Sequence, residues 1–141
     1  MNVPSEQTIT GGCLCGALRY EARGAPRFMG YCFCADCRKA SGSGFIPVMM
    51  YPSAQLTIAG PSSVHAHDLG GGRAAHRNSC SVCHSLVFGG VRGTSEWHTL
   101  YAGSLDEPRH FVPTVAIYTQ GKPDWALVPD GVKIYQWGTS S

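Results

Sequence analysis

Residues 11–17 read Gly-Gly-Cys-Leu-Cys-Gly-Ala, and two further cysteine-rich stretches follow them in the chain. Residues 32–37 read Cys-Phe-Cys-Ala-Asp-Cys, and residues 80–83 read Cys-Ser-Val-Cys. Each stretch brings two or three thiols into one turn of backbone, where one soft cation can bind them as thiolates. Zinc takes four ligands in a tetrahedron, and two paired arms from distant parts of a chain make a closed structural site. The seven cysteines therefore predict one four-thiolate site and one three-thiolate site with a vacant position for chemistry.

A disulfide framework is the competing interpretation of these cysteines. An odd number leaves one thiol unpaired, and a bridge between Cys13 and Cys15 would close a strained ring. The first ten residues have no basic start and no apolar run, so nothing in them points to secretion into an oxidising compartment. A redox pair is conceivable within residues 34–37 or 80–83, but neither pair is expected to open a helix in a strand–helix–strand pattern. Metal binding is the preferred interpretation.

The composition is that of a globular chain. Of its 141 residues, 43% are apolar and 14% are charged, which distinguishes it from disordered proteins. We expect one zinc-binding domain over residues 1–141, a common domain length. No apolar stretch approaches the roughly 20 residues of a membrane span, and we expect a cytoplasmic protein without a membrane partner.

The formal net charge is +2, and the eleven lysines and arginines form no basic run. Proteins that bind nucleic acids usually carry a basic stripe, so no nucleic-acid partner is expected. Two zinc ions bound to seven thiolates would lower the net charge by three, to about −1.

Short strands joined by turns are the expected secondary structure, because 18 glycines and nine prolines fall at close intervals. Alternating apolar residues, or β-branched and aromatic ones, predict strands that include residues 18–22, 44–51, 55–58, 97–101, 112–118 and 132–137. Glycine and proline groups predict turns at residues 24–26, 60–62, 70–72, 89–90 and 129–131. One short helix is expected over residues 35–41, ending near Gly42. The fold class is therefore mainly β, with antiparallel sheets and the metal-binding arms on connecting loops.

The first and third cysteine stretches are expected to form the structural site. Cys13 and Cys15 would pair with Cys80 and Cys83 and tie the N-terminal strand to the middle of the chain. Gly16 can adopt a positive φ, which lets backbone N–H groups turn toward the sulfurs and stabilise their charge.

The second stretch supplies three thiolates, Cys32, Cys34 and Cys37, from one loop. Water or a substrate thiol would complete the tetrahedron, and a zinc-bound thiol stays ionised at neutral pH although a free one is mostly protonated. A closed site is the alternative, with one histidine as fourth ligand, and its candidates are His65, His67, His76, His84, His98 and His110.

Several neighbouring residues are candidates for contact with a substrate. Arg38 and Lys39 follow the three thiolates directly and are candidates for contact with an anionic substrate, since arginine can bind a carboxylate through two nitrogens, although they can equally be solvated charges. Backbone N–H groups around Ser41 and Ser43 are further candidates. Three aromatic residues are candidates for the walls of a cleft, although aromatic residues in strands more often belong to the core: Trp97, Tyr101 and Trp125.

Together these residues resemble the family of glutathione-dependent formaldehyde-activating enzymes, which includes centromere protein V. The resemblance covers nearly the whole chain and rests on GGCLCGALRYE, CFCADCRKASGSGF, the leucine and glycine of QLTIAG, NSCSVCHS, YAGSLDEP and KPDW. It implies a mainly β fold of the Mss4-like (β-tent) type with two zinc sites. By motif position, the four-cysteine set is the structural site, and Cys32, Cys34 and Cys37 form the active one.

Three positions depart from the pattern of many family members. His84 stands where a glycine often follows the last zinc cysteine, and a non-glycine residue in a left-handed turn costs about 1 kcal/mol. Phe33 stands where histidine or another small or polar residue is frequent. Residues 115–117 read Val-Ala-Ile where a histidine is frequent.

The resemblance implies a zinc-dependent carbon–sulfur lyase or synthase that acts on a thiol–aldehyde adduct such as S-(hydroxymethyl)glutathione. Its partners would be glutathione, or another small thiol, and a small aldehyde. Arg38 and Lys39 would then contact the carboxylates of glutathione. Two alternatives stay open: a zinc-stabilised binding module without catalysis, and the same zinc–thiol chemistry on a different small substrate.

Overall fold

The computed structural model describes residues 7–139, and its strands form two sheets. The fold is mainly β, with 44% of residues in strands and 14% in helices. The smaller sheet has the order β1-β2-β5 and is antiparallel throughout. Its strands are β1 (Thr8–Gly12), β2 (Arg19–Arg23) and β5 (Leu56–Ala59).

The larger sheet has eight strands in the order β11-β10-β3-β4-β9-β8-β7-β6. All of its pairs are antiparallel except β10, which runs parallel to both β3 and β11. The strands are β3 (Phe28–Cys32), β4 (Ile46–Pro52), β6 (Ser62–Gly70), β7 (Arg73–Cys80), β8 (Leu86–Gly89), β9 (Trp97–Tyr101), β10 (Val115–Ile117) and β11 (Lys133–Ile134).

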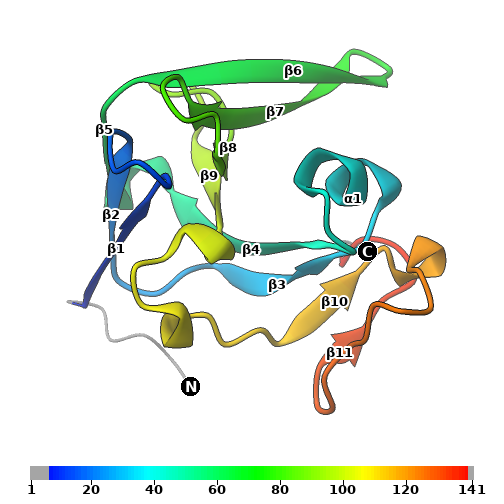
Figure 1. Cartoon of the computed structure of the whole chain (residues 1–141). Coiled ribbons are helices and arrows are strands. Elements are labelled where there is room, and N and C mark those ends of the chain that lie inside the picture. The colour runs from blue at the N-terminus through cyan, green and yellow to red at the C-terminus, as the bar shows by residue number, and fades with distance from the viewer. Residues whose placement is uncertain (1–6, 140–141) are drawn as a thin grey trace.

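The larger sheet is strongly bent, so that the β6–β7 hairpin at the top of Figure 1 lies opposite β3 and β4. Helix α1 (Ala35–Ser41) sits at the open side of this bend, beneath the hairpin. The 3-10 helices connect strands and are η1 (Ser53–Gln55), η2 (Ala102–Ser104), η3 (Pro108–His110) and η4 (Thr119–Gly121). In the part of the chain that the structure describes, no helix has the length and apolar character needed to cross a membrane.

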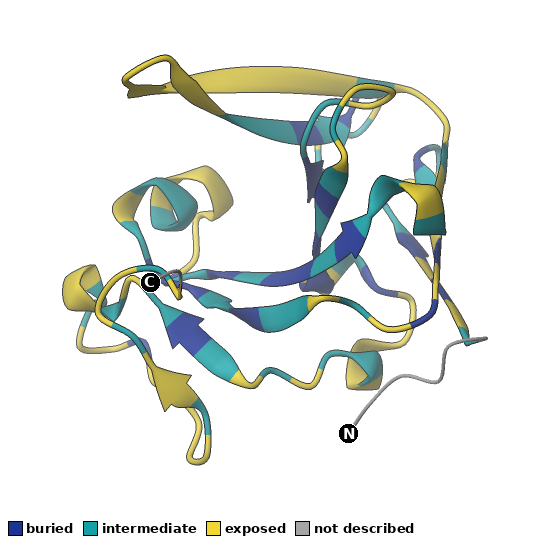
Figure 2. Cartoon of the chain, turned by 180° about the vertical axis from the view of Figure 1, so that it is seen from behind, coloured by how far each residue is buried: buried dark blue, intermediate teal, exposed yellow. Residues whose placement is uncertain are grey.

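The main core lies between the two sheets. Ile9, Leu18 and Tyr20 of the N-terminal region pack against the apolar face of the larger sheet, where Met49 and Leu100 are fully buried. A second cluster gathers Phe33, which follows β3, with Ala116 of β10 and Ala126. Figure 2 shows the contrast between these buried strands and β6, which is exposed along nearly its whole length.

The expected helix is confirmed over residues 35–41, and it ends at Gly42, whose φ of 71° is left-handed. The expected strands correspond to β2, β4, β5 and β9, and to shorter strands at β10 and β11. The expected turn at residues 70–72 joins β6 to β7, and all three of its glycines have positive φ. None of the predicted strand ranges covers β1, β3, β6, β7 or β8.

Candidate metal centres and active site

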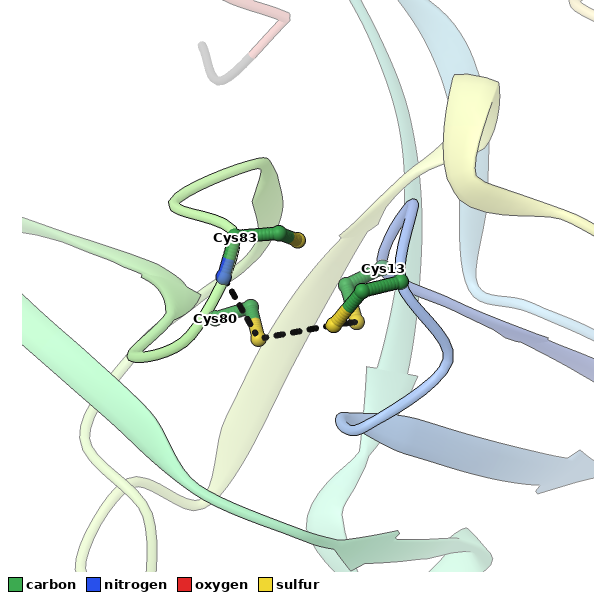
Figure 3. Close-up of side chains that lie close together, drawn as sticks. Cys13, Cys80 and Cys83 are labelled. Atoms are coloured by element: carbon green, nitrogen blue, oxygen red, sulfur yellow. Dashed lines mark hydrogen bonds between the residues drawn. The ribbon is translucent and has the colours of Figure 1, made fainter.

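Four cysteines from two distant segments converge in the first cluster. Cys13 and Cys15 follow the end of β1, Cys80 ends β7, and Cys83 lies in the turn before β8. Their sulfurs all lie within 4.8 Å of one another, and Figure 3 shows Cys13 on one loop facing Cys80 and Cys83 on the other. This is the predicted pairing of the first and third cysteine stretches.

The sulfur spacing of this cluster fits a tetrahedral metal ion. The Cys15 sulfur is 3.6 Å from that of Cys13 and 3.8 Å from that of Cys80. A tetrahedron with zinc–sulfur bonds of about 2.3 Å has sulfur–sulfur edges of about 3.8 Å, whereas a disulfide bond measures about 2.05 Å. All seven cysteines are free thiols. The donor set therefore suits zinc, and the disulfide interpretation does not apply.

Two left-handed turns shape this cluster. Gly16 has a φ of 86°, and the N–H of Leu18, just beyond it, donates to the Cys13 sulfur at 3.2 Å. His84 has a φ of 65° and its N–H donates to the Cys80 carbonyl at 2.9 Å. The sequence-based expectations of a positive φ at Gly16 and of a left-handed turn at His84 are both confirmed.

Ser85 links the two arms of the cluster, a role that the sequence analysis missed. Its hydroxyl accepts a hydrogen bond from the Leu14 N–H at 3.0 Å and lies 3.2 Å from the Cys83 sulfur. Hydrogen bonds from the Ser85 side chain and backbone lower the pKa of Cys83 to about 5. The Cys83 thiol therefore loses its proton more readily than a free thiol, as a metal ligand must.

The remaining three cysteines form the second cluster at the start of α1. Cys32 ends β3, Cys34 is the N-cap of α1, and Cys37 lies in its first turn, where its N–H donates to the Cys34 sulfur at 3.2 Å. The three sulfurs lie within 4.8 Å of one another. Hydrogen bonds from Cys32 and Cys37 lower the pKa of Cys34, so this thiol ionises first.

The expectation that neither Cys-x-x-Cys pair opens a helix between strands was wrong for Cys34, because α1 lies between β3 and β4. Those two strands are antiparallel neighbours, however, so α1 is part of a hairpin connection and not the crossover of a parallel strand–helix–strand unit.

No histidine joins the second cluster among residues 7–139. His67 instead approaches Asp36 on the surface, with Nε2 and Oδ2 3.6 Å apart, and His98 is buried with Nδ1 2.8 Å from the Gly89 carbonyl oxygen. The described part of the chain therefore supplies three thiol ligands here, a set that zinc can use with a fourth, exchangeable position.

A cavity of about 530 Å³ lies against the second cluster, inside the bend of the larger sheet. Cys32 and Cys37 line it, and most of its wall is apolar. The apolar lining includes Phe28, Ile46, Val48, Met50, Trp97 and Ile117. The polar lining includes His76, Arg77, Thr99 and Tyr101.

The family description "Glutathione-dependent formaldehyde-activating enzyme" matches residues 8–121, which is most of the chain. The chain belongs to that family. A solved structure of a Rhodobacter sphaeroides protein is similar in fold to this family member, with a TM-score of 0.54 and 18% identity over 72% of this chain and 94% of the other. No curated protein matches this chain. Membership in the formaldehyde-activating family supports a chemistry of glutathione and formaldehyde.

The structure of this family member separates the candidate substrate contacts into two groups. Trp97 and Tyr101 line the cavity, whereas Trp125 lies outside it and is largely exposed. Arg38 and Lys39 are not part of its lining, so their contact with a carboxylate stays a prediction.

Ser41 and Ser43 line a second hollow of about 920 Å³, which also borders Cys13 of the four-cysteine cluster. They therefore do not share the cavity of the three-cysteine cluster, where the sequence analysis had grouped them.

Arg77 is the cation that the sequence analysis missed. It lines the same cavity as Cys37, although β7 carries it 40 residues further along the chain. Burial raises the pKa of Tyr101 to about 12, and the nearby charge of Arg77 opposes that rise. No motif marks Arg77, because only the bend of the sheet brings β7 over α1.

Proposed function

We propose that this protein is a cytoplasmic, zinc-dependent carbon–sulfur lyase or synthase acting on the adduct of a small thiol and an aldehyde, such as S-(hydroxymethyl)glutathione. The observation that carries the proposal is the cavity of about 530 Å³ lined by Cys32 and Cys37 of a three-thiol cluster. Family membership supports the thiol and the aldehyde, and the all-sulfur donor sets support zinc.

The proposed reaction joins a thiol to a carbonyl compound without any change of oxidation state. A carbon–sulfur bond forms, the carbonyl π pair moves to oxygen, and this oxygen takes up a proton; the lyase direction reverses these changes. Zinc bound by Cys32, Cys34 and Cys37 would supply a positive centre that keeps a thiol deprotonated at neutral pH.

Tyr101 is the proposed proton donor to the developing alkoxide. Its side chain is nearly buried and lines the same cavity as Cys32 and Cys37. Because burial raises its pKa to about 12, the phenol keeps its proton at neutral pH and can donate it or a hydrogen bond. General acid groups in such positions contribute roughly 10²–10⁴-fold to rates.

The apolar wall of the cavity would exclude bulk water from the reacting atoms. Water competes with the thiol for the carbonyl carbon, and it weakens every electrostatic contact in the site. Phe28, Val48 and Trp97 supply much of this wall.

Two serine variants test the proposed roles of the clusters. The zinc-loaded protein should accelerate the exchange between glutathione, formaldehyde and their adduct, measured by exchange NMR. Cys34→Ser should abolish this acceleration and leave the protein folded, because Cys34 belongs to the cluster beside the cavity. Cys83→Ser should unfold the protein, because Cys83 helps to join the N-terminal loop to β7.

Circular dichroism of both variants provides the control. Equal loss of structure in the two would contradict the division into an active and a structural cluster. An unaccelerated exchange in the folded wild-type protein would reject formaldehyde as the substrate and leave a different small substrate or a zinc-stabilised binding module.

A further inference from the structure

Two side chains that carry hydroxyls lie next to each other on the cavity side of β9. Thr99 and Tyr101 are separated by one residue, so they project from the same face of the strand, and both line the cavity. Leu100, the residue between them, is fully buried in the main core. The proposed reaction uses the Tyr101 hydroxyl and leaves that of Thr99 without a role.

Both hydroxyls lie over a glycine of the neighbouring strand. Gly89 is buried, lines the same cavity and pairs with Thr99 across β8 and β9. A Cβ atom added at Gly89 would clash with the Thr99 Oγ1 and would lie 3.0 Å from the Tyr101 hydroxyl oxygen. The two oxygens are therefore close neighbours, because both lie within 3.0 Å of that one point.

Apolar side chains pack around the rest of the Tyr101 side chain, which belongs to one buried cluster with Ile46 and Val48. Burial raises the pKa of Tyr101 to about 12, and the charge of Arg77 and the side chain of Thr99 oppose this rise. Apolar neighbours cannot fix the direction of an O–H bond, whereas an adjacent hydroxyl can. Thr99 is therefore a residue that can orient the Tyr101 phenol.

The direction of the phenol proton matters for the proposed reaction. A general acid must hold its proton within hydrogen-bond reach of the atom that receives it, which here is the former carbonyl oxygen. Each hydroxyl has one donor and two acceptor positions. If the Thr99 hydroxyl donates to the Tyr101 oxygen, the phenol proton points away from Thr99 and stays available to a ligand in the cavity.

We propose that Thr99 is a positioning residue that holds the Tyr101 phenol with its proton directed into the cavity, and that Gly89 leaves the space that this pair of hydroxyls needs. The role of Tyr101 as proton donor rests on the proposed function, whereas the contact between the two hydroxyls does not. Thr99 acts through Tyr101 and touches no reacting atom.

The first test is kinetic and uses exchange NMR with glutathione and formaldehyde. Thr99→Val keeps the shape of the side chain but removes its hydroxyl. It should lower kcat about three- to tenfold with KM nearly unchanged, as expected for the loss of one hydrogen bond. Thr99→Ser keeps a hydroxyl and should retain most of the rate. Thr94→Val is the matched control, because Thr94 is exposed and is not part of the cavity lining.

Further variants show whether Thr99 acts through Tyr101. In a Tyr101→Phe background, Thr99→Val should have no further effect, because no phenol is left to hold. Gly89→Ala should lower kcat as Thr99→Val does, because the added methyl group displaces the Thr99 hydroxyl. Gly121→Ala is its control, because a Cβ atom at Gly121 meets no other atom within 4 Å. An equal loss from Thr99→Val with and without the phenol would overturn the proposal.

The second test observes the phenol without any reaction. In zinc-loaded protein that contains tyrosine labelled with ¹³C at Cζ, the Tyr101 signal is the one that Tyr101→Phe removes. Thr99→Val should shift this signal, whereas Thr99→Ser and Thr94→Val should leave it in place. An unshifted signal, or a shift that Thr99→Ser shares, would overturn the proposal.

The two tests separate this proposal from the proposed function. If the wild-type protein does not accelerate the exchange, the proposed function fails, and a signal shifted by Thr99→Val alone would still establish that Thr99 holds the phenol. If the exchange is accelerated but Thr99→Val changes neither kcat nor the Tyr101 signal, the function stands and the positioning role of Thr99 is rejected.

Discussion

Asn78 is a buried polar residue at an irregular point of the larger sheet. Its side-chain amide donates to the carbonyl oxygens of Phe88 at 3.1 Å and Gly90 at 2.6 Å, where the pairing of β7 with β8 shifts register. A buried carbonyl that loses its donor pays a desolvation cost. The side chain therefore holds the bulged end of β8 against β7.

Asn78→Ala should lower the free energy of unfolding by about 1–3 kcal/mol, measured by urea denaturation of the zinc-loaded protein. Ser63→Ala is the control: Ser63 is an exposed residue of β6 that bonds the Ser81 hydroxyl, and its change should stay within about 0.5 kcal/mol. Equal losses in the two variants would show that the buried amide has no special role.

Two of the residues that depart from the family pattern pack in the same place. Phe33 is fully buried in one cluster with Ala116, beside Ala126. A large apolar side chain and a small one pack together there, so this part of the interior is an apolar core.

At the scale of secondary structure elements, an ion pair fastens the smaller sheet to the segment after η2. Arg19 of β2 binds Asp106 through two nitrogens, and the Thr10 hydroxyl of β1 donates to the same carboxylate at 2.7 Å. Hydrogen bonds from Arg19 and Thr10 lower the pKa of Asp106 to about 2. Both charged groups are partly exposed, which limits their contribution to about 0.5–1 kcal/mol.

Because the folded-state pKa of Asp106 is depressed, its stabilisation is complete above the unfolded value of about 3.9 and is lost only as the pH falls toward 2. Asp106→Asn should therefore be less stable than wild type by a constant amount between pH 7 and 5, measured by urea denaturation at each pH. Glu107→Gln is the neighbouring control. A difference that fades within this range would contradict the depressed pKa.

Two of the strands that sequence reasoning predicted are largely buried and contain no exposed residue. In β4 the buried residues include Ile46, Val48 and Met49, and in β9 they include Leu100 and Tyr101. Strand β6 is the opposite case, since eight of its nine residues are exposed. Hydrophobic periodicity cannot detect such a strand, and only the three glycines of the turn at residues 70–72 indicated the hairpin.

The candidate site also has one part that could be predicted from the sequence and one part that could not. Cysteine spacing is a local property, so the membership of both clusters could be predicted. The cation of the cavity could not be predicted. Arg77 lines the cavity together with Cys37 only because the sheet bends, whereas Arg38, adjacent to Cys37 in sequence, is not part of the lining. Contacts made by bending a sheet leave no pattern in the chain.

For the molecule as a whole, the four-cysteine cluster joins the two sheets. Cys13 and Cys15 belong to the loop after β1 of the smaller sheet, while Cys80 ends β7 of the larger one. A metal ion there adds its binding free energy to the stability of the fold. The apolar contacts between the two sheets stabilise the same junction in addition to the metal ion.

Removing zinc with a chelator should therefore loosen the junction between the sheets before the interior strands. Hydrogen exchange measured by mass spectrometry should rise first in β1 and at the end of β7, and later in the central pair β4 and β9 as the protein unfolds. Cys34→Ser loaded with zinc is the control and should retain wild-type protection in β1. Unchanged exchange in β1 after chelation would show that the sheets are held without metal.

Strand β7 contributes to both centres, since Cys80 ends it and Arg77 lies three residues earlier. If both clusters bind metal as proposed, filling the first one sets the position of the strand that serves the second. Maturation of the protein would then be ordered in time: the ion taken up second is useful only in molecules that already hold the first. In a cell short of zinc, activity would fall as the product of two occupancies, more steeply than the metal supply itself.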